Sequence, residues 1–417
     1  MQHEQRTLSD GLILRSPKKN DDVDKYVALH EAVVGEGTIA SRLLRHFPNA
    51  RPDDFLVVED PQADQFVSAS CLLPWKCQLD ALTLDVAMLE MIATRPEHRR
   101  QGLVRAQIDI YHRRVAERHF DLSIIQGIPY YYRQFGYAYA IDHWARDSLP
   151  TYRIPDWDDR LTLSYSLRQA TTGDIGDLTR LYRQAMSPVQ VHMRRSGEYW
   201  RYLIEHAAYP VAMIESPDET MPAGYVALRE PEGVARIDVV ESCVTSLPCA
   251  RAVLRHLKQQ SADEIRLYWP QDGTLVRLAR SFRSTPEPRY QWLARITDTA
   301  ALLRKMKPVF EERVAGSPCP RLTQPLILNT YHHTAFKLEF VEGRLNSVEE
   351  LGFVDASNGE DGGDLCIPPE AFVRLILGYR SLAELRDAWP DIDVKAADRD
   401  ILDILFPRMS SCVLTPY

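Results

Sequence analysis

The sequence predicts a protein of mixed α+β and α/β class, built from three consecutive domains. The first 150 residues alternate strand-like and helical segments. A degenerate copy of the opening pattern follows at 165–186, where "YSLRQATTGDIGDLTRLYRQAM" echoes residues 12–33. The last hundred residues alternate apolar and polar positions, as in "FKLEFVEGRL". At 417 residues, the chain is also too long for one ordinary core.

Two segments indicate where the domains meet. The stretch "DSLPTYRIPDWDDRLT", at 147–162, is rich in proline and aspartate, which is typical of a connection between folded units. A second connection is expected at 296–320, before the alternating pattern of the last domain begins. We therefore predict domains at 1–150, 151–300 and 301–417.

The first domain is expected to carry helices between the strands of its sheet. Asp21 and Asp22 lead into a helix whose apolar residues recur at helical spacing. The turn "PQADQ" separates two of the strands. The predicted strands are "LILRS" (12–16), "DFLVVED" (54–60), "QFVSASCLLPWKCQL" (65–79), "LTLDVAMLEMIAT" (82–94) and "DLSIIQGI" (121–128).

The other two domains carry weaker patterns. After its first helix, the second domain offers a strand at "GYVALRE", a strand at "VARIDVVESCVTS" and a helix at "ARAVLRHLKQQ". In the third domain, the alternating strands are followed by an acidic, glycine-rich loop, "DASNGEDGGD", and two helices.

Composition excludes several classes of function. The net charge of −8 and the absence of a basic face argue against nucleic-acid binding. No run of about 18 apolar residues exists, so no membrane span is expected. The polar N-terminus has no leader pattern, which favours the cytoplasm. Seven scattered cysteines without C-x-x-C, and histidines without H-E-x-x-H, predict reduced thiols and no bound metal.

The sharpest motif is "MIATRPEHRRQGLVRAQIDIYHRRV", residues 91–115. A strand ends at Thr94, Pro96 turns the chain, and a helix begins near Gly102. One face of that helix is predicted to be buried, because its apolar residues recur at helical spacing: Val104, Ile108, Tyr111 and Val115.

The loop before this helix has the chemistry of a phosphate site. Free backbone N–H groups and the positive end of the helix dipole converge there. Gly102 allows close approach of the backbone, while Arg99, Arg100 and Arg105 supply charge for phosphate oxygens. The alternative is a solvated, basic helix start; the order strand, proline, R-R-Q-G, helix favours a pyrophosphate site.

Three consecutive tyrosines follow the next strand in "PYYYRQFGY", residues 129–137. Pro129 and Gly136 bound a predicted short helix at 129–135. Tyr131 and Phe135, four residues apart, are expected to pack inward together, which leaves Tyr132 free to face a groove. Packing of all three tyrosines is the alternative.

The order strand, R-x-x-G loop, helix, strand, Y-x-x-F-G-Y resembles the GNAT superfamily of acyl-CoA-dependent N-acyltransferases. The family pattern Q/R-x-x-G-x-G/A falls on Arg99, Gly102 and Val104, and Val104 departs from the final small residue. Over its whole length, the chain resembles the Eis-type (enhanced intracellular survival) acetyltransferases. These combine a catalytic GNAT domain, a GNAT-like domain without a cofactor site, and a sterol-carrier-protein-like domain.

The resemblance is weaker in the second and third domains. No R-x-x-G-x-G/A occurs around "VVESCVTSLPCARAVL", as expected for a degenerate second GNAT-like domain. The stretch "EAFVRLILGYRSLAEL" resembles the helix of the sterol-carrier-like domain. The fold implied is two GNAT-like mixed-sheet domains, the second degenerate, followed by a sterol-carrier-like α+β domain.

The resemblance implies a role for each matching residue. The backbone of Ile92, Ala93 and Thr94 would pair with the pantetheine arm of acetyl-CoA, as an added strand does. Gly127 and Ile128 would lie beside its acyl end. The residues implied at its pyrophosphate are Arg99, Arg100, Gln101, Gly102, Leu103, Val104 and Arg105.

Tyr132 matches the family's general acid, which protonates the departing thiolate. A thiol has a pKa of about 8.5 and tyrosine about 10, so a positioned phenol can stabilise and reprotonate the sulfur. The resemblance further implies that the base is the chain's own terminal carboxylate, here that of Tyr417. A disordered terminus is the default alternative. Glu90 is the second candidate base. The alternative interpretation is that Glu90 is an ordinary surface acid on a strand.

The leading hypothesis is an N-acetyltransferase that transfers an acetyl group directly from acetyl-CoA to a primary amine. The acceptor is an aminoglycoside, a polyamine-like molecule or a lysine side chain, and the sequence leaves this choice open. A non-catalytic acyl-CoA sensor or scaffold is the alternative. Lipid transport by the third domain is a weaker alternative function. The resemblance also implies a homo-oligomer, a hexamer.

Overall fold

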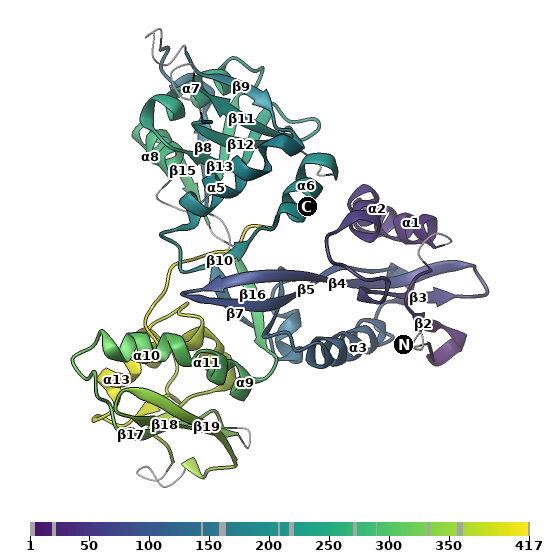
Figure 1. The fold of residues 1–417 in the computed structure, drawn as a ribbon. Coiled ribbons are helices and arrows are strands. Elements are labelled where there is room, and N and C mark those ends of the chain that lie inside the picture. The colour runs from purple at the N-terminus through teal and green to yellow at the C-terminus, as the bar shows by residue number, and fades with distance from the viewer. Residues whose placement is uncertain are drawn as a thin grey trace.

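The computed structural model describes residues 5–18, 22–142, 145–157, 164–206, 209–216, 221–269, 273–288, 290–331, 334–356 and 362–415. These residues fold around three sheets, which form three lobes of the molecule (Figure 1). The mixed α and β composition confirms the predicted fold class.

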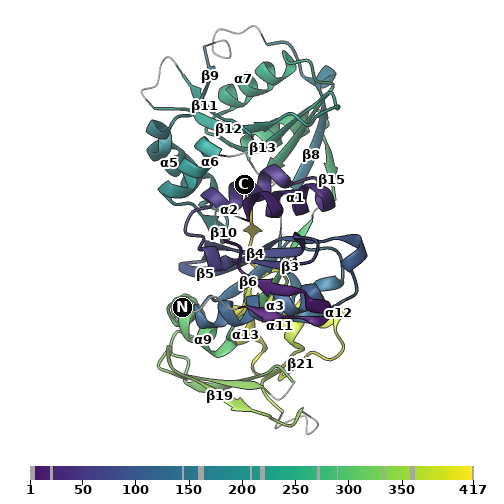
Figure 2. The same cartoon turned by 90° about the vertical axis from the view of Figure 1, so that its right-hand side faces the viewer.

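The first sheet forms the central lobe. It contains a parallel pair, β5 and β6, among antiparallel neighbours. Helices α1 (Val23–Val34) and α2 (Gly37–His46) cover one face, and α3 (Leu103–Glu117) covers the other (Figures 1 and 2). In order across the sheet, its main strands are β1 (Arg6–Thr7), β2 (Ile13–Arg15), β3 (Phe55–Asp60), β4 (Gln65–Leu79), β5 (Leu82–Thr94), β6 (Leu122–Ile125), β16 (Gln291–Ile296) and β7 (Ala138–Asp142).

The long strands β4 and β5 span the predicted ranges, 65–79 and 82–94. Their apolar residues are almost continuously buried, because helices lie on both faces of the sheet. The outer half of β4 also pairs with β10 (Val191–Arg194), and β10 pairs in parallel with β22 (Ser411–Cys412). The chain's last strand therefore joins the first sheet.

The second sheet forms the upper lobe of Figure 1. Two helix pairs, α5 with α6 and α7 with α8, accompany it. Its strands, in order, are β15 (Thr285–Glu287), β8 (Ala145–Pro150), β14 (Glu264–Trp269), β13 (Arg236–Val244), β12 (Gly224–Arg229), β11 (Val211–Glu215) and β9 (Ser166–Gln169). Its helices are α5 (Ile175–Met186), α6 (Gly197–His206), α7 (Leu247–Lys258) and α8 (Thr274–Ser281).

The third sheet forms the lower lobe, with α10 and α11 between its strands and the first sheet (Figure 1). Strand β18 shows the predicted alternation, since Phe336, Leu338 and Phe340 are buried and the residues between them are half-buried. The strands are β19 (Arg344–Gly352), β18 (Ala335–Val341), β17 (Gln324–Asn329), β20 (Leu365–Cys366) and β21 (Asp393–Val394). The helices are α9 (Thr299–Lys305), α10 (Lys307–Ala315), α11 (Pro369–Ile376), α12 (Leu382–Ala388) and α13 (Arg399–Leu405).

Some elements differ from the sequence prediction. Three helices, not two, follow the acidic loop in the described residues. The helix expected at 129–135 is a 3-10 helix, η4 (Tyr131–Phe135). The remaining 3-10 turns are η1 (Ser9–Gly11), η2 (Pro52–Asp54), η3 (Pro96–His98), η5 (Thr151–Arg153) and η6 (Thr172–Asp174).

The three sheets exchange strands across the predicted domain limits of 1–150, 151–300 and 301–417, which stay a prediction. Strand β8, before the first limit, pairs with β14 and β15 of the second sheet. Strand β16, before the second limit, lies between β6 and β7 of the first sheet. Strand β10 also leaves the second lobe to extend the first sheet. The lobes are therefore joined by shared strands as well as by contacts.

In the part of the chain that the structure describes, none of the helices combines the length and the apolar character needed to cross a membrane.

A buried ion pair holds the start of α6 against the second sheet. Both Arg195 and Glu241 have side chains that are 1% exposed, and an Arg195 Nη1–H donates to Glu241 Oε1 at 2.6 Å. The Tyr225 hydroxyl donates to the same carboxylate. The Arg195 guanidinium lies 4.2 Å from the ring centre of Tyr182. The ion pair is thus buried among a hydrogen-bonded tyrosine and an aromatic ring.

We predict that Arg195→Met lowers the free energy of unfolding by about 3–5 kcal/mol, because it leaves the Glu241 carboxylate buried without its partner. Urea unfolding measures the change. The matched control is Arg201→Met on α6, whose side chain is 59% exposed and lies 3.8 Å from Glu205. That change is expected to stay within about 0.5 kcal/mol. Equal losses in both variants would contradict the prediction.

Candidate active site

The central opening of the first sheet lies where β5 and β6 separate. The two parallel strands pair over only three positions, from Val86–Leu122 to Met88–Ile124. Strand β5 continues to Thr94, whereas β6 ends at Ile125. The backbone of β5 beyond Met88 therefore has no strand beside it on the β6 side. Such a gap at the carboxyl ends of parallel strands is a common place for ligands.

A bulge in β5 marks the same position. Between the pairs Cys71–Glu90 and Ala69–Ala93, two residues of β5 oppose one residue of β4. Met91, in this bulge, has a left-handed φ of 52°. Its carbonyl lies 3.0 Å from the Nε2 atom of His30 on α1. The bulge thus redirects the strand just before residues 92–94, and a buried histidine contacts it.

The R-R-Q-G loop precedes α3, as predicted, with Gly102 at the N-cap. Arg100 and Gly102 both have left-handed backbones, with φ of 64° and 77°. A Cβ atom on Gly102 would meet nothing within 4 Å, so the space in front of the helix is open. The N–H groups of the first turn point into that space. Open space, free N–H groups and nearby arginines form a cradle with features that suit a phosphate group.

The arginines of the loop have different surroundings. Arg99 and Arg100 are exposed beside the cradle, and the Arg99 Nε–H donates to the Thr94 carbonyl at 3.4 Å. Arg105 donates to Gln134 Oε1 at 2.6 Å and lies 4.9 Å from the ring centre of Phe135. It therefore ties the start of α3 to η4. Gln101 is exposed, Leu103 is buried and Val104 is half-buried.

A pocket of about 280 Å³ opens into the gap between β5 and β6. Its wall includes two carboxylates, Glu36 at the start of α2 and Glu90 on β5. Partial enclosure raises the pKa of Glu36. The full lining is His30, Val34, Glu36, Ile39, Leu89, Glu90, Met91, Ile92, Ile125, Gln126, Gly127, Ile128 and Tyr132.

Tyr132 is the buried phenol of this pocket, with 5% of its surface exposed. Burial raises its pKa well above the ordinary value, and Tyr131 and Glu90 add to the rise. The phenol therefore stays protonated throughout the neutral pH range. Its ring lies over Gly127, since a Cβ atom at that glycine would come within 2.1 Å of the ring carbons. The Tyr290 hydroxyl donates to the Gly127 carbonyl.

The prediction of which of the three tyrosines packs inward was partly wrong. Tyr132 packs inward, Tyr131 and Phe135 are half-buried, and Tyr130 is 75% exposed. The reason is the local geometry: a 3-10 helix turns by about 120° per residue, and Tyr130 starts it from a left-handed φ of 69°. Tyr132 nevertheless lines the pocket, so it is both buried and beside the predicted site.

A buried hydrogen-bond network supports the α3 side of the gap. The Ser123 hydroxyl lies 2.7 Å from that of Tyr111 and 2.6 Å from that of Tyr137. Tyr111 also donates to the Ala87 carbonyl at 3.0 Å. His112 Nε2 lies 3.1 Å from the Tyr137 hydroxyl. Burial, with a smaller effect of Arg295, lowers the pKa of His112 to about 4, so the network carries no charge at neutral pH.

The C-terminal tail approaches from the opposite face of the sheet. The Trp292 indole N–H donates to the Val413 carbonyl at 3.0 Å, and the Val413 N–H donates to Asp142 at 3.2 Å. Val413 shares one buried cluster with Met88, and Glu90 points to the same face because strand side chains alternate. The tail is buried through Thr415. Tyr417, the predicted source of the base, lies outside the described residues.

The structure brings together most of the other predicted residues. Ile92, Ala93 and Thr94 lie on the free edge of β5, and Gly127 and Ile128 follow β6. Sequence reasoning missed His30, Glu36 and Tyr290. No motif marks them, and only the packing of α1, α2 and the segment before β16 against the gap brings them there. In the described residues, no three side chains of His, Cys, Asp or Glu gather as a metal-binding group.

Comparison with known proteins agrees with this geometry. Residues 15–140 match the family described as "Acetyltransferase (GNAT) domain". This part of the chain is therefore similar to GNAT acetyltransferase domains. The match runs from the end of β2 into β7, and so includes the R-R-Q-G loop, the gap between β5 and β6, and Tyr132. A search of curated proteins finds no match.

The whole chain is similar to solved structures of GCN5-related N-acetyltransferases, which confirms the fold. One from Anabaena variabilis has 14% identity and a TM-score of 0.69, and one from Kribbella flavida has 16% and 0.68. Eis1 from Mycobacterium abscessus has 16% identity and a TM-score of 0.63. Each match covers 97% of this chain and 100% of the other. The match to the GNAT family description supports acyl transfer in general.

We predict that Gly127→Ala lowers acetyl-transfer turnover about 100-fold, because the new methyl group pushes the Tyr132 ring out of place. Binding of acetyl-CoA, measured by calorimetry, is expected to change far less, since the R-R-Q-G cradle is untouched. The control is Gly176→Ala in α5, where a Cβ atom meets nothing within 4 Å. Unchanged turnover in the Gly127 variant would contradict this placement of the phenol.

Proposed function

We propose that the protein is an Eis-type, acetyl-CoA-dependent N-acetyltransferase that acts on a primary amine. The carrying observation is the buried Tyr132 phenol, which lies over Gly127 in the gap between β5 and β6, in the same domain as a phosphate-binding cradle. The amine nitrogen attacks the thioester carbonyl in a ternary complex, and the carbon–sulfur bond breaks. Tyr132 then donates a proton to the departing thiolate as general acid.

The co-substrate is acetyl-CoA, and each part of it has matching residues. In this proposal, the pantetheine arm pairs with the backbone of 92–94 along the free edge of β5, as an added strand does. The pyrophosphate binds to the loop and helix start at 99–105. The acetyl end lies beside Gly127 and Ile128. The site requires no metal.

The pocket favours a cationic acceptor. Glu36 and Glu90 lie on its wall, and His30, its only basic residue among the described ones, is kept uncharged because burial lowers its pKa. Two carboxylates on the wall of one pocket attract an ammonium group. This supports an aminoglycoside, a polyamine-like molecule or a lysine side chain as acceptor.

The amine must lose a proton, and two groups could accept it. The first is the terminal carboxylate of Tyr417, supported by the burial of the preceding tail through Thr415. The second is Glu90, which lines the pocket and lies close enough to influence Tyr132. We favour the terminal carboxylate, because the tail enters on the face into which Glu90 also points.

The remaining features follow the Eis-type resemblance. The second lobe acts as a degenerate GNAT-like domain, and the third as a sterol-carrier-like domain that delivers the chain end rather than carrying lipid. A cytoplasmic homo-oligomer, a hexamer, is expected. The competing function is a non-catalytic acyl-CoA sensor, which would keep the cradle but have no need of Tyr132.

Replacing Tyr132 by phenylalanine is the main test of the chemistry. We predict that Tyr132→Phe lowers kcat about 100- to 10,000-fold while acetyl-CoA binding falls little, because only the proton donor is lost. Thiol release from acetyl-CoA over a panel of aminoglycosides, polyamines, amino acids and peptides provides the assay. Tyr131→Phe, one residue away, is the control and should keep its turnover. Acetyl-CoA binding without thiol release in the wild type would favour the sensor.

The two candidate bases can be separated by paired variants. We predict that deletion of Tyr417 lowers kcat strongly at neutral pH, whereas Glu90→Gln mainly raises KM for the amine, because the base itself is kept. Full activity after the deletion, together with a large loss of kcat in Glu90→Gln, would assign the base to Glu90. The pH profile of kcat should move only in the variant that removes the base.

A further inference from the structure

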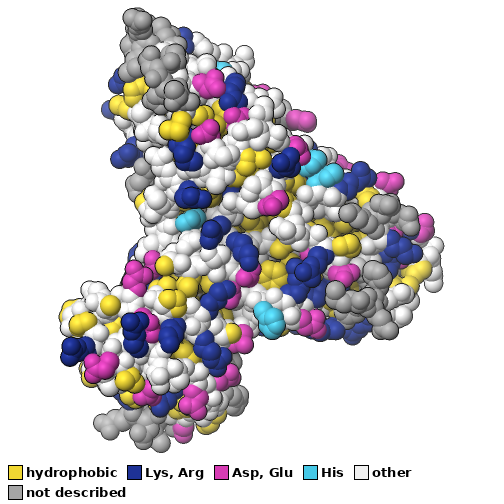
Figure 3. Space-filling view, viewed as in Figure 1, with side chains coloured by type: hydrophobic (Ala, Val, Ile, Leu, Met, Phe, Trp, Pro, Cys, Tyr) yellow, Lys and Arg dark blue, Asp and Glu magenta, His cyan; other side chains and the backbone are white. Residues whose placement is uncertain are grey.

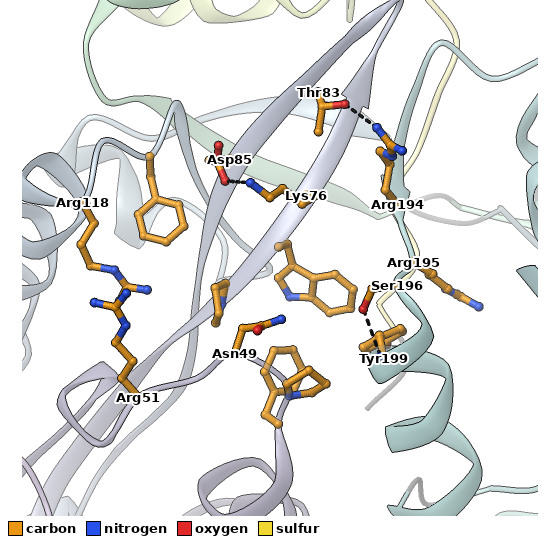
Figure 4. Close-up of a pocket in the computed structure, with 15 residues that line it drawn as sticks. Asn49, Arg51, Lys76, Thr83, Asp85, Arg118, Arg194, Arg195, Ser196 and Tyr199 are labelled. Atoms are coloured by element: carbon orange, nitrogen blue, oxygen red, sulfur yellow. Dashed lines mark hydrogen bonds and ion pairs between the residues drawn. The ribbon is translucent and has the colours of Figure 1, made fainter. Parts of the chain in front are cut away.

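Strand β5 borders two pockets, one along each half of its length. The pocket drawn in Figure 4, of about 840 Å³, includes Thr83 and Asp85 from the first half. Both side chains are bonded to cations of the same wall, since Asp85 pairs with Lys76 and the Thr83 hydroxyl accepts from Arg194 at 2.6 Å. The second half of β5 borders the pocket that contains Tyr132, and the bulge lies in this half. The irregular part of the strand is therefore the part beside the reaction pocket.

The bulge changes which face of the sheet each side chain of β5 joins. Before the bulge, Met88 packs in the cluster that contains the buried residues of α1, and Leu89 packs in the cluster that contains Tyr132. A regular strand would return Ile92 to the Met88 side, because successive side chains alternate. In the structure, Ile92 packs against the cluster of Leu89, and Ala93 packs in the cluster of Met88. The extra residue has thus shifted the rest of the strand by one position.

The same shift decides which backbone groups line the gap between β5 and β6. Along a strand, the N–H and C=O groups of successive residues point to opposite edges. A slip by one residue therefore exchanges the groups that face β4 for those that face the gap. In the β4 register, Ala93 pairs with Ala69 and Thr94 pairs with Ser68. The bulge thus sets which N–H and C=O groups of residues 92–94 are open to a bound ligand.

The carbonyl group of Met91 needs a donor from outside the sheet. Among the residues that the structure describes, Met91 has no paired residue in the registers of β4 and β6. It is 6% exposed, and buried carbonyl groups need a hydrogen-bond donor. The Nε2 atom of His30 lies 3.0 Å from the Met91 carbonyl oxygen. A side chain of α1 therefore joins the helix layer to the bulge.

The surroundings of His30 decide where its proton lies. Its side chain is fully buried, whereas other histidines reach the surface on the face drawn in Figure 3. Burial lowers its pKa, so the ring is neutral at pH 7 and has a single N–H group. Its Nδ1 atom lies 2.8 Å from the Tyr26 carbonyl, which already accepts the backbone N–H of His30 within α1. The proton is therefore of most use on Nε2, where it serves the Met91 carbonyl.

We propose that His30 is a positioning residue for acetyl transfer. Its Nε2–H group holds the Met91 carbonyl, and the bulge held in this way sets the edge of residues 92–94 along which the pantetheine arm lies. This inference rests on the proposed function. His30 acts through the backbone of Met91 and transfers no proton to or from the reactants. Loss of its donor displaces the thioester along β5 and leaves the phosphate cradle at 99–102 unchanged.

Calorimetry on the full chain with two ligands tests the proposal. Acetyl-CoA is compared with 3′-phosphoadenosine 5′-diphosphate, which carries the phosphates of CoA without its pantetheine arm. His30→Leu removes the donor and keeps an apolar side chain of similar size. We expect this variant to bind acetyl-CoA about tenfold more weakly, and the diphosphate less than about twofold more weakly, because only the arm lies along the bulge. In the transfer assay, the same variant should raise KM for acetyl-CoA and lower kcat.

Two amide variants separate the donor from the ring. The side-chain amide of glutamine reaches about as far as Nε2 of histidine, whereas that of asparagine reaches about as far as Nδ1. We therefore expect His30→Gln to restore most of the affinity for acetyl-CoA, and His30→Asn to bind it as weakly as His30→Leu does. Leu29→Val, also fully buried on α1, is the matched control for a disturbed core. It should lower Tm and keep the affinity for acetyl-CoA.

The possible failures can be told apart. Equal affinity for acetyl-CoA in the wild type and His30→Leu, or an equal loss for both ligands, would overturn this inference and leave the proposed function standing. No binding of acetyl-CoA by the wild type would overturn both. If the His30 variants do not fold, nitrogen-15 NMR of the histidine rings in the wild type still tests the inference. The Nε2–H tautomer of His30 is expected at neutral pH, and the Nδ1–H tautomer would overturn it.

Discussion

The early end of one strand pair is the constraint on which the site depends. Because β5 and β6 pair over only three positions, the part of β5 beyond Met88 has no strand beside it on the β6 side. Buried backbone groups need partners, so this edge is suited to an extended ligand that pairs as a strand does. The bulge at Met91, the burial of Tyr132 and the packing of Tyr290 against Gly127 all lie around the same gap. Filling the gap with a longer β6 would remove the site and leave the fold intact.

Charge is distributed in keeping with this constraint. The α3 side has the exposed arginines of the R-R-Q-G loop, where phosphates are expected, and an uncharged network of tyrosines behind it. The opposite side has Glu36 and Glu90, where an amine is expected. The two reactants would therefore enter from opposite faces of one sheet and meet beside Tyr132.

The sequence predicted the parts of the fold that depend on local chemistry. Strands β4 and β5 were found because long apolar runs end at turns, and the start of α3 because Gly102 stands at its N-cap. The burial of Tyr132 was missed because residue spacing cannot distinguish a 3-10 turn from an α-helical one. The sequence could not predict that Glu36 lines the pocket or that β16 joins the first sheet. Both depend on contacts between segments distant in sequence. The proposed role of Tyr132 comes from the family resemblance, since the local pattern alone left that role open.

Strand β16 has a consequence for the order in which the protein can assemble. It pairs with β6 on one edge and β7 on the other, although the chain reaches it about 150 residues after β7. During synthesis, the edges of β6 and β7 that pair with β16 therefore stay unpaired until the second lobe has been made. Open strand edges of this kind favour pairing with other chains. A fragment that ends at residue 150 should thus aggregate even though it holds the R-R-Q-G loop and Tyr132, and co-expression with a piece containing β16 should relieve it.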